Sequence, residues 1–216
     1  MRKLALRSLY STFRKEFGFL DWWPGDTKLE IVVGAVLTQQ TSWKNVEKAI
    51  GSIKAANAMN LEKLAGMNLP ALELLIRSSG FYRQKAMRLK GLLAAISEYG
   101  SIEKFFDTDA KTLRKRLLEM NGIGRETADS IILYAAEKPV FVVDAYTRRI
   151  LGRIYGIGEN VRYDELKGMM EGSMERNLEL YKDFHAQFVE LGKRYCKTKP
   201  LCSECPARNA CRYGSG

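Results

Sequence analysis

Residues 117–132 read LLEMNGIGRETADSII, and this stretch joins two helical patterns through a very short turn. Apolar residues recur at three- and four-residue steps on both sides of Asn121-Gly122-Ile123-Gly124, so the turn has room only for a tight hairpin. Glycines at 122 and 124 permit backbone angles that are closed to other residues, and they let a second backbone come near. Ile123 is expected to be buried and to fix the turn.

The amides of this turn lie at the start of the second helix, where N–H groups and the helix dipole attract a phosphate. A plain helix–turn–helix packing motif would look similar, because G-x-G alone is a weak signal. The long helix before the turn and the polar residues after it favour a helix-hairpin-helix that binds the DNA backbone. The expected DNA contacts in this motif are Gly122, Ile123, Gly124, Arg125 and Thr127.

Helical periodicity extends through most of the chain, so the fold class that we expect is all-α. Two apolar stretches could form strands, IVVGAVL at 31–37 and VFVVD at 140–144, but both are short and have no alternating partner. The expected helices cover residues 1–17, 28–38, 43–55, 70–76, 83–99, 110–119, 125–137, 145–154 and 177–192.

The charge balance favours an anionic partner. The chain has 35 Lys and Arg against 25 Asp and Glu, a net charge of +10, which suits nucleic acid but would also describe a solvated basic surface. No apolar run is long enough to cross a bilayer, and the first residues lack a signal-peptide pattern. We therefore expect a cytoplasmic protein with no membrane partner.

All four cysteines lie within sixteen residues, in the pattern C-x5-C-x2-C-x5-C. A disulfide framework is not expected in a reducing compartment, whereas four thiolates this close suit a metal, either zinc or a [4Fe–4S] cluster. Zinc sites more often use two C-x-x-C pairs, and the chain has one, so the spacing favours iron–sulfur over zinc. The expected ligands are Cys196, Cys202, Cys205 and Cys211.

Asp144 closes an apolar run and precedes the helix expected over 145–154. Taken alone it is most simply a helix N-cap, which is a common role of Asp. A capping carboxylate is also held rigidly at a helix N-terminus, where it could serve an active site near a bound phosphate. Arg148 and Arg149 follow one turn later, and they fit either contacts to DNA or a solvated helix face.

Three segments in order, NGIGRETA at 121–128, VVDAYTRR at 142–149 and HAQFVELGKRYC at 185–196, resemble the endonuclease III superfamily of DNA glycosylases. The resemblance runs from about residue 26 to the last cysteine. In that family the first gap between cluster cysteines is usually six residues, whereas it is five here.

The resemblance implies a monomer of two helical domains with a DNA-binding cleft between them. One domain is a helical bundle over 26–137 that contains the hairpin at about 113–137. The other is discontinuous, formed by 1–25 and 138–216, and carries a [4Fe–4S] cluster loop at 196–211.

A second implication concerns the reaction. Bifunctional members of the family carry a lysine in the motif G-R-K-T-A, and its amine forms a Schiff base with the sugar and enables strand cleavage. This chain has Glu126 at that position, and a carboxylate cannot form an imine. Unless another lysine reaches the sugar, we expect a monofunctional DNA N-glycosylase without AP lyase activity.

The tryptophans narrow the substrate class. Trp22 and Trp23 in DWWPGD, Trp43 in LTQQTSW, and SGFYRQKAMRL at 79–89 resemble the 3-methyladenine glycosylase branch, where such aromatics line the base pocket. Core packing is the alternative for each indole. Purines alkylated at N3 or N7 are cationic, so an indole face attracts them, and they leave with little acid catalysis. The expected substrate is double-stranded DNA containing 3-methyladenine or 7-methylguanine.

In the expected mechanism Gln40 matches the family's wedge glutamine and fills the space of a flipped nucleotide. Asp144 stabilises the oxocarbenium-like sugar and orients or deprotonates the attacking water. Lys193 is placed at the base pocket, and His185 is expected to be structural. Three alternatives stay open: an endonuclease III-like glycosylase/AP lyase for oxidised pyrimidines, a mismatch-specific thymine or adenine glycosylase, and a non-catalytic DNA-binding or redox-sensing protein.

Overall fold

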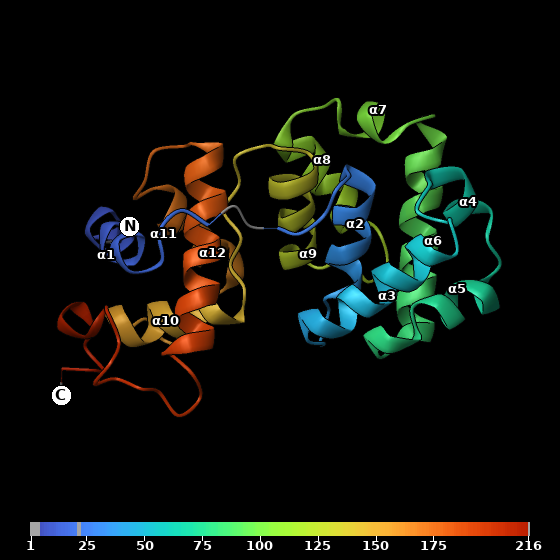
Figure 1. Cartoon of the computed structure of the whole chain (residues 1–216). Helices are drawn as coiled ribbons and strands as arrows, with labels where there is room; N and C mark the ends of the chain where they lie inside the picture. Colours follow the sequence, from blue (N-terminus) through green and yellow to red (C-terminus); the bar gives the residue numbers. More distant parts are fainter. Residues whose placement is uncertain (1–4, 21–22, 216) are drawn as a thin grey trace. The chain divides into compact units, whose positions relative to one another are not determined.

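The computed structural model describes residues 5–20 and 23–215 (Figure 1). These residues form helices and loops with no strand among them, so the all-α class is confirmed. The chain divides into two compact units, Trp23–Lys138 and the discontinuous pair Met1–Trp22 with Pro139–Gly216. The sequence placed these two boundaries at 25/26 and 137/138.

The contiguous unit holds most of the helices. They are α2 (Lys28–Leu37), α3 (Trp43–Ala55), α4 (Leu61–Gly66), α5 (Leu69–Leu75), the 3-10 turn η1 (Arg77–Ser79), α6 (Tyr82–Glu98), α7 (Ile102–Phe106), α8 (Ala110–Leu118), α9 (Arg125–Ser130) and the π-helical turn η2 (Ile131–Ala135).

The apolar stretch at 31–37, which could have been a strand, forms most of α2. The side chain of Thr27 starts this helix by accepting a hydrogen bond from the N–H of Glu30 at 3.2 Å. From Val32 to Leu37 every residue is buried, so the helix passes through the core of its unit. A helix that is apolar on all sides suits such a buried position.

Two short helices of this unit, α4 and α7, were not predicted. Each begins at a residue whose side chain accepts from a backbone N–H three positions later, Asn60 for α4 and Ser101 for α7. Helices of one or two turns are too short to show a periodic pattern, so their capping residues were the available signal.

The discontinuous unit is built from α1 (Leu6–Phe17), α10 (Ala145–Tyr155), α11 (Tyr163–Glu171), α12 (Leu178–Arg194) and the 3-10 turn η3 (Arg208–Ala210). Its core is aromatic. Phe184 and Phe188 stack along α12 with ring centroids 4.8 Å apart, and Phe13 of α1 meets Phe188 edge to face at 5.6 Å. The other strand candidate, VFVVD at 140–144, forms no strand; residues 140–143 are buried and lead to Asp144 at the start of α10.

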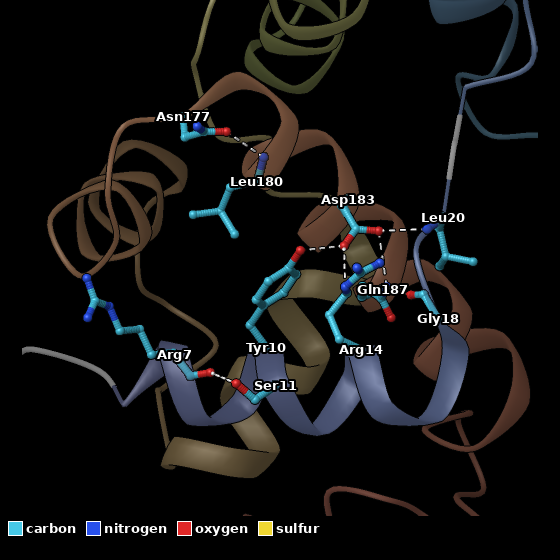
Figure 2. Close-up of polar contacts among 10 residues, drawn as sticks. All are labelled: Arg7, Tyr10, Ser11, Arg14, Gly18, Leu20, Asn177, Leu180, Asp183 and Gln187. Atoms are coloured by element: carbon cyan, nitrogen blue, oxygen red, sulfur yellow. Dashed lines mark hydrogen bonds and ion pairs between the residues drawn. The ribbon is translucent and has the colours of Figure 1, made fainter.

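A buried carboxylate joins the two ends of this unit, as Figure 2 shows. Asp183 of α12 is fully buried and accepts hydrogen bonds from the hydroxyl of Tyr10 at 2.6 Å and the backbone N–H of Leu20 at 2.8 Å. Arg14 Nε lies 3.6 Å from the same carboxylate. Burial, together with the bond to Asp183, raises the pKa of Tyr10 to about 12, so the phenol keeps its proton at neutral pH and donates it to the carboxylate.

No helix within the described residues has the length and apolar character needed to cross a membrane.

Candidate functional site

The hairpin between α8 and α9 has a left-handed residue at its centre. Gly122 has φ +79°, and a Cβ added there would overlap the side chain of Arg88. The glycine is therefore required twice, by the backbone angle and by the close approach of Arg88. Ile123 is 4% exposed and its N–H bonds to the carbonyl of Met120 at 3.2 Å, which fixes the turn as the sequence predicted.

Gly124 differs from the expectation. Its φ is −84°, an angle that other residues adopt, so its backbone does not require glycine. A Cβ added there would meet nothing within 4 Å, which leaves open space beside the first turn of α9. Arg125 is exposed, whereas the hydroxyl-bearing side chain of Thr127 is buried at 8% exposure.

An ion pair fixes the two hairpin helices to each other. Arg114 of α8 donates from Nε and Nη2 to the two oxygens of Asp129 in α9, at 2.8 and 3.2 Å. Asp129 is fully buried, and bidentate pairing is the geometry in which an arginine holds a buried carboxylate best. The hairpin is thus a rigid element of its unit.

The residues after α2 point in two directions. Gln40 is exposed and has a left-handed backbone, with φ +53°. Its neighbour Gln39 turns inward and donates a hydrogen bond to the carbonyl of Gly122 at 3.0 Å. The glutamine that the sequence singled out, Gln40, is therefore the one that projects from the surface.

Two of the three tryptophans pack together. Trp23 and Trp43 are partly buried and meet edge to face, with ring centroids 5.8 Å apart and planes at 73°. Tyr134, in the π-helical turn, also packs on Trp23, with ring centroids 4.7 Å apart and planes at 32°. Both indoles pack against α2 at Gly34, since a Cβ there would lie 3.5 Å from Trp43 and 3.7 Å from Trp23, which are ordinary contact distances. Trp22 lies outside the described residues.

A carboxylate accompanies this aromatic group. The indole N–H of Trp43 donates to Glu47 Oε1 at 3.0 Å, one helical turn along α3. The cluster of Trp23, Trp43 and Tyr134 therefore presents aromatic faces next to a negative charge.

Asp144 is the N-cap of α10, as its position in the sequence predicted. Its Oδ1 accepts the backbone N–H of Thr147 at 2.7 Å, and its Oδ2 lies 3.6 Å from Nε2 of His185 in α12. The side chain of Asp144 is 14% exposed and that of His185 is 3% exposed. Burial acts to raise the pKa of Asp144, but the bonds from His185 and Thr147 outweigh it and lower the pKa below its usual value. The carboxylate is ionised at neutral pH.

Two other predicted residues have defined surroundings in the same unit. Nη1 of Arg148 donates to the carbonyls of Glu159 and Val161, at 3.3 and 2.6 Å, so this arginine braces the loop that follows α10. Lys193 is 43% exposed and lies 3.7 Å from Glu190 on its own helix.

The four cysteines line one small cavity in the C-terminal loop, together with Arg153 and Tyr213. Burial raises the pKa of the Cys205 thiol; a hydrogen bond from the backbone of Ala207 acts against this, and the charges of the other three cysteines act with it. Within the part of the chain that the structure describes, no three His, Cys, Asp or Glu side chains approach closely enough to hold one metal ion.

Arginines of α10 tie this loop to the helix that Asp144 caps. Arg153 Nη1 donates to the sulfur of Cys196 at 3.2 Å and to the carbonyl of Lys197 at 2.6 Å. Arg149 Nε donates to the carbonyl of Cys196 at 2.8 Å. Sequence reasoning had assigned none of these roles, because only the fold brings α10 beside the cysteine segment.

Comparisons with known proteins agree with this geometry. The family model described as HhH-GPD superfamily base excision DNA repair protein matches residues 33–176. A protein of Methanocaldococcus jannaschii, whose name gives it provisionally as a DNA repair glycosylase, is 45% identical over 206 residues, which cover 94% of each chain.

Two solved structures are similar. The H. pylori 3-methyladenine DNA glycosylase bound to 1,N6-ethenoadenine has a TM-score of 0.74 and 35% identity, covering 88% of this chain and 94% of that one. An endonuclease III in non-covalent complex with DNA has a TM-score of 0.82 at 23% identity, covering 100% and 97% of the two chains, and supports the fold alone.

Proposed function

The chain belongs to the HhH-GPD superfamily of base excision DNA repair proteins and is a DNA glycosylase, and on that premise we propose that it excises alkylated purines from double-stranded DNA. The observation that supports this substrate class is the group of partly buried indoles, Trp23 and Trp43. Purines alkylated at N3 or N7, such as 3-methyladenine and 7-methylguanine, carry a positive charge. An electron-rich aromatic face attracts such a cation more strongly than a neutral base.

Glu47 strengthens this preference. Its carboxylate accepts the indole N–H of Trp43 at 3.0 Å, which increases the electron density of the ring and puts a negative charge beside it. Both effects favour a cationic base over a neutral one. The 35% identity to a 3-methyladenine DNA glycosylase supports the same substrate class.

Asp144 supplies the chemistry in this proposal. The damaged nucleotide leaves the base stack, Gln40 fills the vacated space, and the base stacks on the indoles. The ionised carboxylate of Asp144 stabilises positive charge on the sugar as the N-glycosidic bond breaks, and it orients the attacking water. A cationic purine leaves as a neutral base, so no protein acid has to protonate it.

The product in this proposal is an intact strand with an abasic site. Glu126 is exposed in the first turn of α9, at the position where lyases of the family carry their nucleophilic lysine. A carboxylate forms no imine with the sugar, so the proposal includes no AP lyase step.

We also propose that Cys196, Cys202, Cys205 and Cys211 hold a [4Fe–4S] cluster. The four thiols line one cavity, and the chain has one C-x-x-C pair where zinc sites more often use two. Such a cluster supplies a rigid scaffold to a loop rich in Lys and Arg, which would otherwise have little apolar surface to order it. Anaerobically purified protein should be brown, contain close to four irons and four sulfides, and lose both in Cys202→Ser.

A panel of lesion duplexes tests the substrate. Wild-type protein should release 3-methyladenine and 7-methylguanine, and nicking should appear only after alkaline treatment. Asp144→Asn, which keeps the size of the side chain but removes its charge, should abolish release. If the protein released only oxidised pyrimidines, or only mismatched thymine or adenine, the proposed substrate class would be wrong. A covalent adduct after borohydride treatment would overturn the monofunctional assignment.

A further inference from the structure

In the loop that follows α2, the described hydrogen bonds to the hairpin come from one side chain, that of Gln39. Its Nε2 donates to the carbonyl of Gly122 and to the hydroxyl oxygen of Thr127, both at 3.0 Å. Its Oε1 accepts from Nη1 of Arg88 at 2.6 Å. One amide therefore joins the loop after α2, the hairpin and α6, and it uses both of its donors and its acceptor.

Arg88 completes this junction. Its aliphatic stem lies where a Cβ on Gly122 would be, and its guanidinium bonds to Gln39. The hairpin turn is thus held by the stem of one side chain and the amide of another. Such contacts fix the turn in both position and orientation.

The loop after α2 is anchored on its other side as well. Lys85 is 1% exposed, and its ammonium group donates to the carbonyls of Leu37 at 2.8 Å and Ser79 at 2.6 Å. Leu37 ends α2, Thr38 is its C-cap, and Gln39 and Gln40 come next. Of these two glutamines, one is held by three hydrogen bonds, while Gln40 next to it is exposed in a left-handed conformation.

We propose that Gln39 and Arg88 are positioning residues that hold Gln40 in a fixed register to the phosphate-binding hairpin. When the hairpin grips the DNA backbone, this junction sets how far Gln40 enters the duplex. Backbone binding and base extrusion are then performed by one rigid body, with no flexible link between them. The inference rests on the proposed role of Gln40 in the glycosylase reaction.

An amide is the side chain that this junction needs. A glutamate at 39 would still pair with Arg88, but its second oxygen would face the carbonyl oxygen of Gly122 and repel it. A leucine would fill a similar volume and leave the Gly122 carbonyl without this donor. Gln39→Leu should therefore free the loop while keeping the helices packed.

A double-mutant cycle tests the proposal, because a residue that acts only through Gln40 loses its effect once Gln40 is gone. Single-turnover base release is measured for wild type, Gln39→Leu, Gln40→Ala and the double variant, on the lesion that wild type cleaves fastest. Gln39→Leu should lower the rate by roughly tenfold, since small misplacements have effects of this size. In the Gln40→Ala background the same change should lower it less than about twofold.

Thr38→Ala is the matched control. Thr38 lies in the same loop, but its hydroxyl bonds to the carbonyl of Gly34 within α2 and not to the hairpin. This variant should keep the wild-type rate within about twofold. Equal effects of Gln39→Leu with and without Gln40, or an equal loss in Thr38→Ala, would overturn the proposal.

A second readout separates this inference from the proposed substrate class. 2-Aminopurine placed beside an abasic-site analogue reports extrusion and wedge entry through its fluorescence, without any base being released. Gln39→Leu should weaken this signal while its Kd for undamaged duplex changes less than about threefold, because the hairpin itself stays intact. If wild type released no alkylated purine, the substrate class would fail, and the fluorescence cycle would still decide the role of Gln39. An unchanged fluorescence signal in Gln39→Leu would refute that role.

Discussion

Nε2 of His185 lies 3.6 Å from Oδ2 of Asp144, so an imidazole from α12 faces the carboxylate that caps α10. The other oxygen of Asp144 is occupied by the N–H of Thr147. These two partners keep the carboxylate ionised although its side chain is 14% exposed. His185 therefore has an electrostatic role in the candidate active site in addition to its place in the core.

Removing the imidazole should shift the pH dependence of base release. His185 is the main partner that lowers the pKa of Asp144 against the effect of burial. In His185→Ala that partner is gone, so the pKa of Asp144 should rise. Because the ionised carboxylate is the active form, the acid limb of the single-turnover pH profile should move to higher pH. His185→Gln, which can still donate a hydrogen bond, should move it less. Superimposable profiles of wild type and His185→Ala would contradict this role.

Glu47→Gln should reduce the preference for cationic bases. The amide can still accept the indole N–H of Trp43, but the negative charge beside the ring is lost. The ratio of release rates for 7-methylguanine over a neutral lesion should decrease two- to fivefold, or about 0.5–1 kcal/mol for an exposed charge. Glu62→Gln, an exposed carboxylate in α4, is the control and should leave the ratio unchanged. An equal decrease in both variants would point to net charge instead.

The two hairpin glycines should differ in their contribution to stability. Gly122→Ala puts a Cβ onto a left-handed backbone and into the stem of Arg88, and the backbone term alone costs about 1–2 kcal/mol. Gly124→Ala meets no atom within 4 Å at φ −84° and loses only the preference for glycine over alanine at the N-cap of α9, so it should cost less than about 1 kcal/mol. Urea unfolding of both variants measures the difference. Similar midpoints for the two would show that the turn can relax around the added carbon.

Arg153→Met should alter the proposed cluster without removing a ligand. Arg153 donates to the sulfur of Cys196 at 3.2 Å, and hydrogen bonds to cluster sulfurs raise the reduction potential. Loss of the donor should make the reduction potential of the cluster more negative. The visible absorption of the cluster should also decay faster when an iron chelator is added. Arg162→Met is the control, because Arg162 is the N-cap residue of α11 and its side chain is 88% exposed. An identical potential in wild type and Arg153→Met would argue against the thiolate contact.

The longer helices were predictable because each repeats its apolar residues over several turns. Periodicity placed α6 at 83–99 and α12 at 177–192, close to the observed Tyr82–Glu98 and Leu178–Arg194. It could not show that the helix expected over 125–137 changes to a π-helical turn at Ile131–Ala135. The pattern of apolar residues is nearly the same for both kinds of turn.

The candidate site was predictable where it depends on local sequence. Gly122, Ile123 and the cap at Asp144 each follow from short-range rules. Even the bond between Trp43 and Glu47 obeys helix spacing, since residues four apart lie on one face. The pairing of His185 with Asp144 depends on how α12 packs on α10, and no local rule gives that.

The contact between Tyr10 and Asp183 spans 173 positions of the chain. During synthesis, the bundle over Trp23–Lys138 leaves the ribosome as one continuous stretch and is able to fold early. Helix α1 cannot pack this early, because its partner α12 lies far along the chain. Its apolar face stays uncovered until α12 has been made, and during this interval a chaperone would protect the nascent protein most.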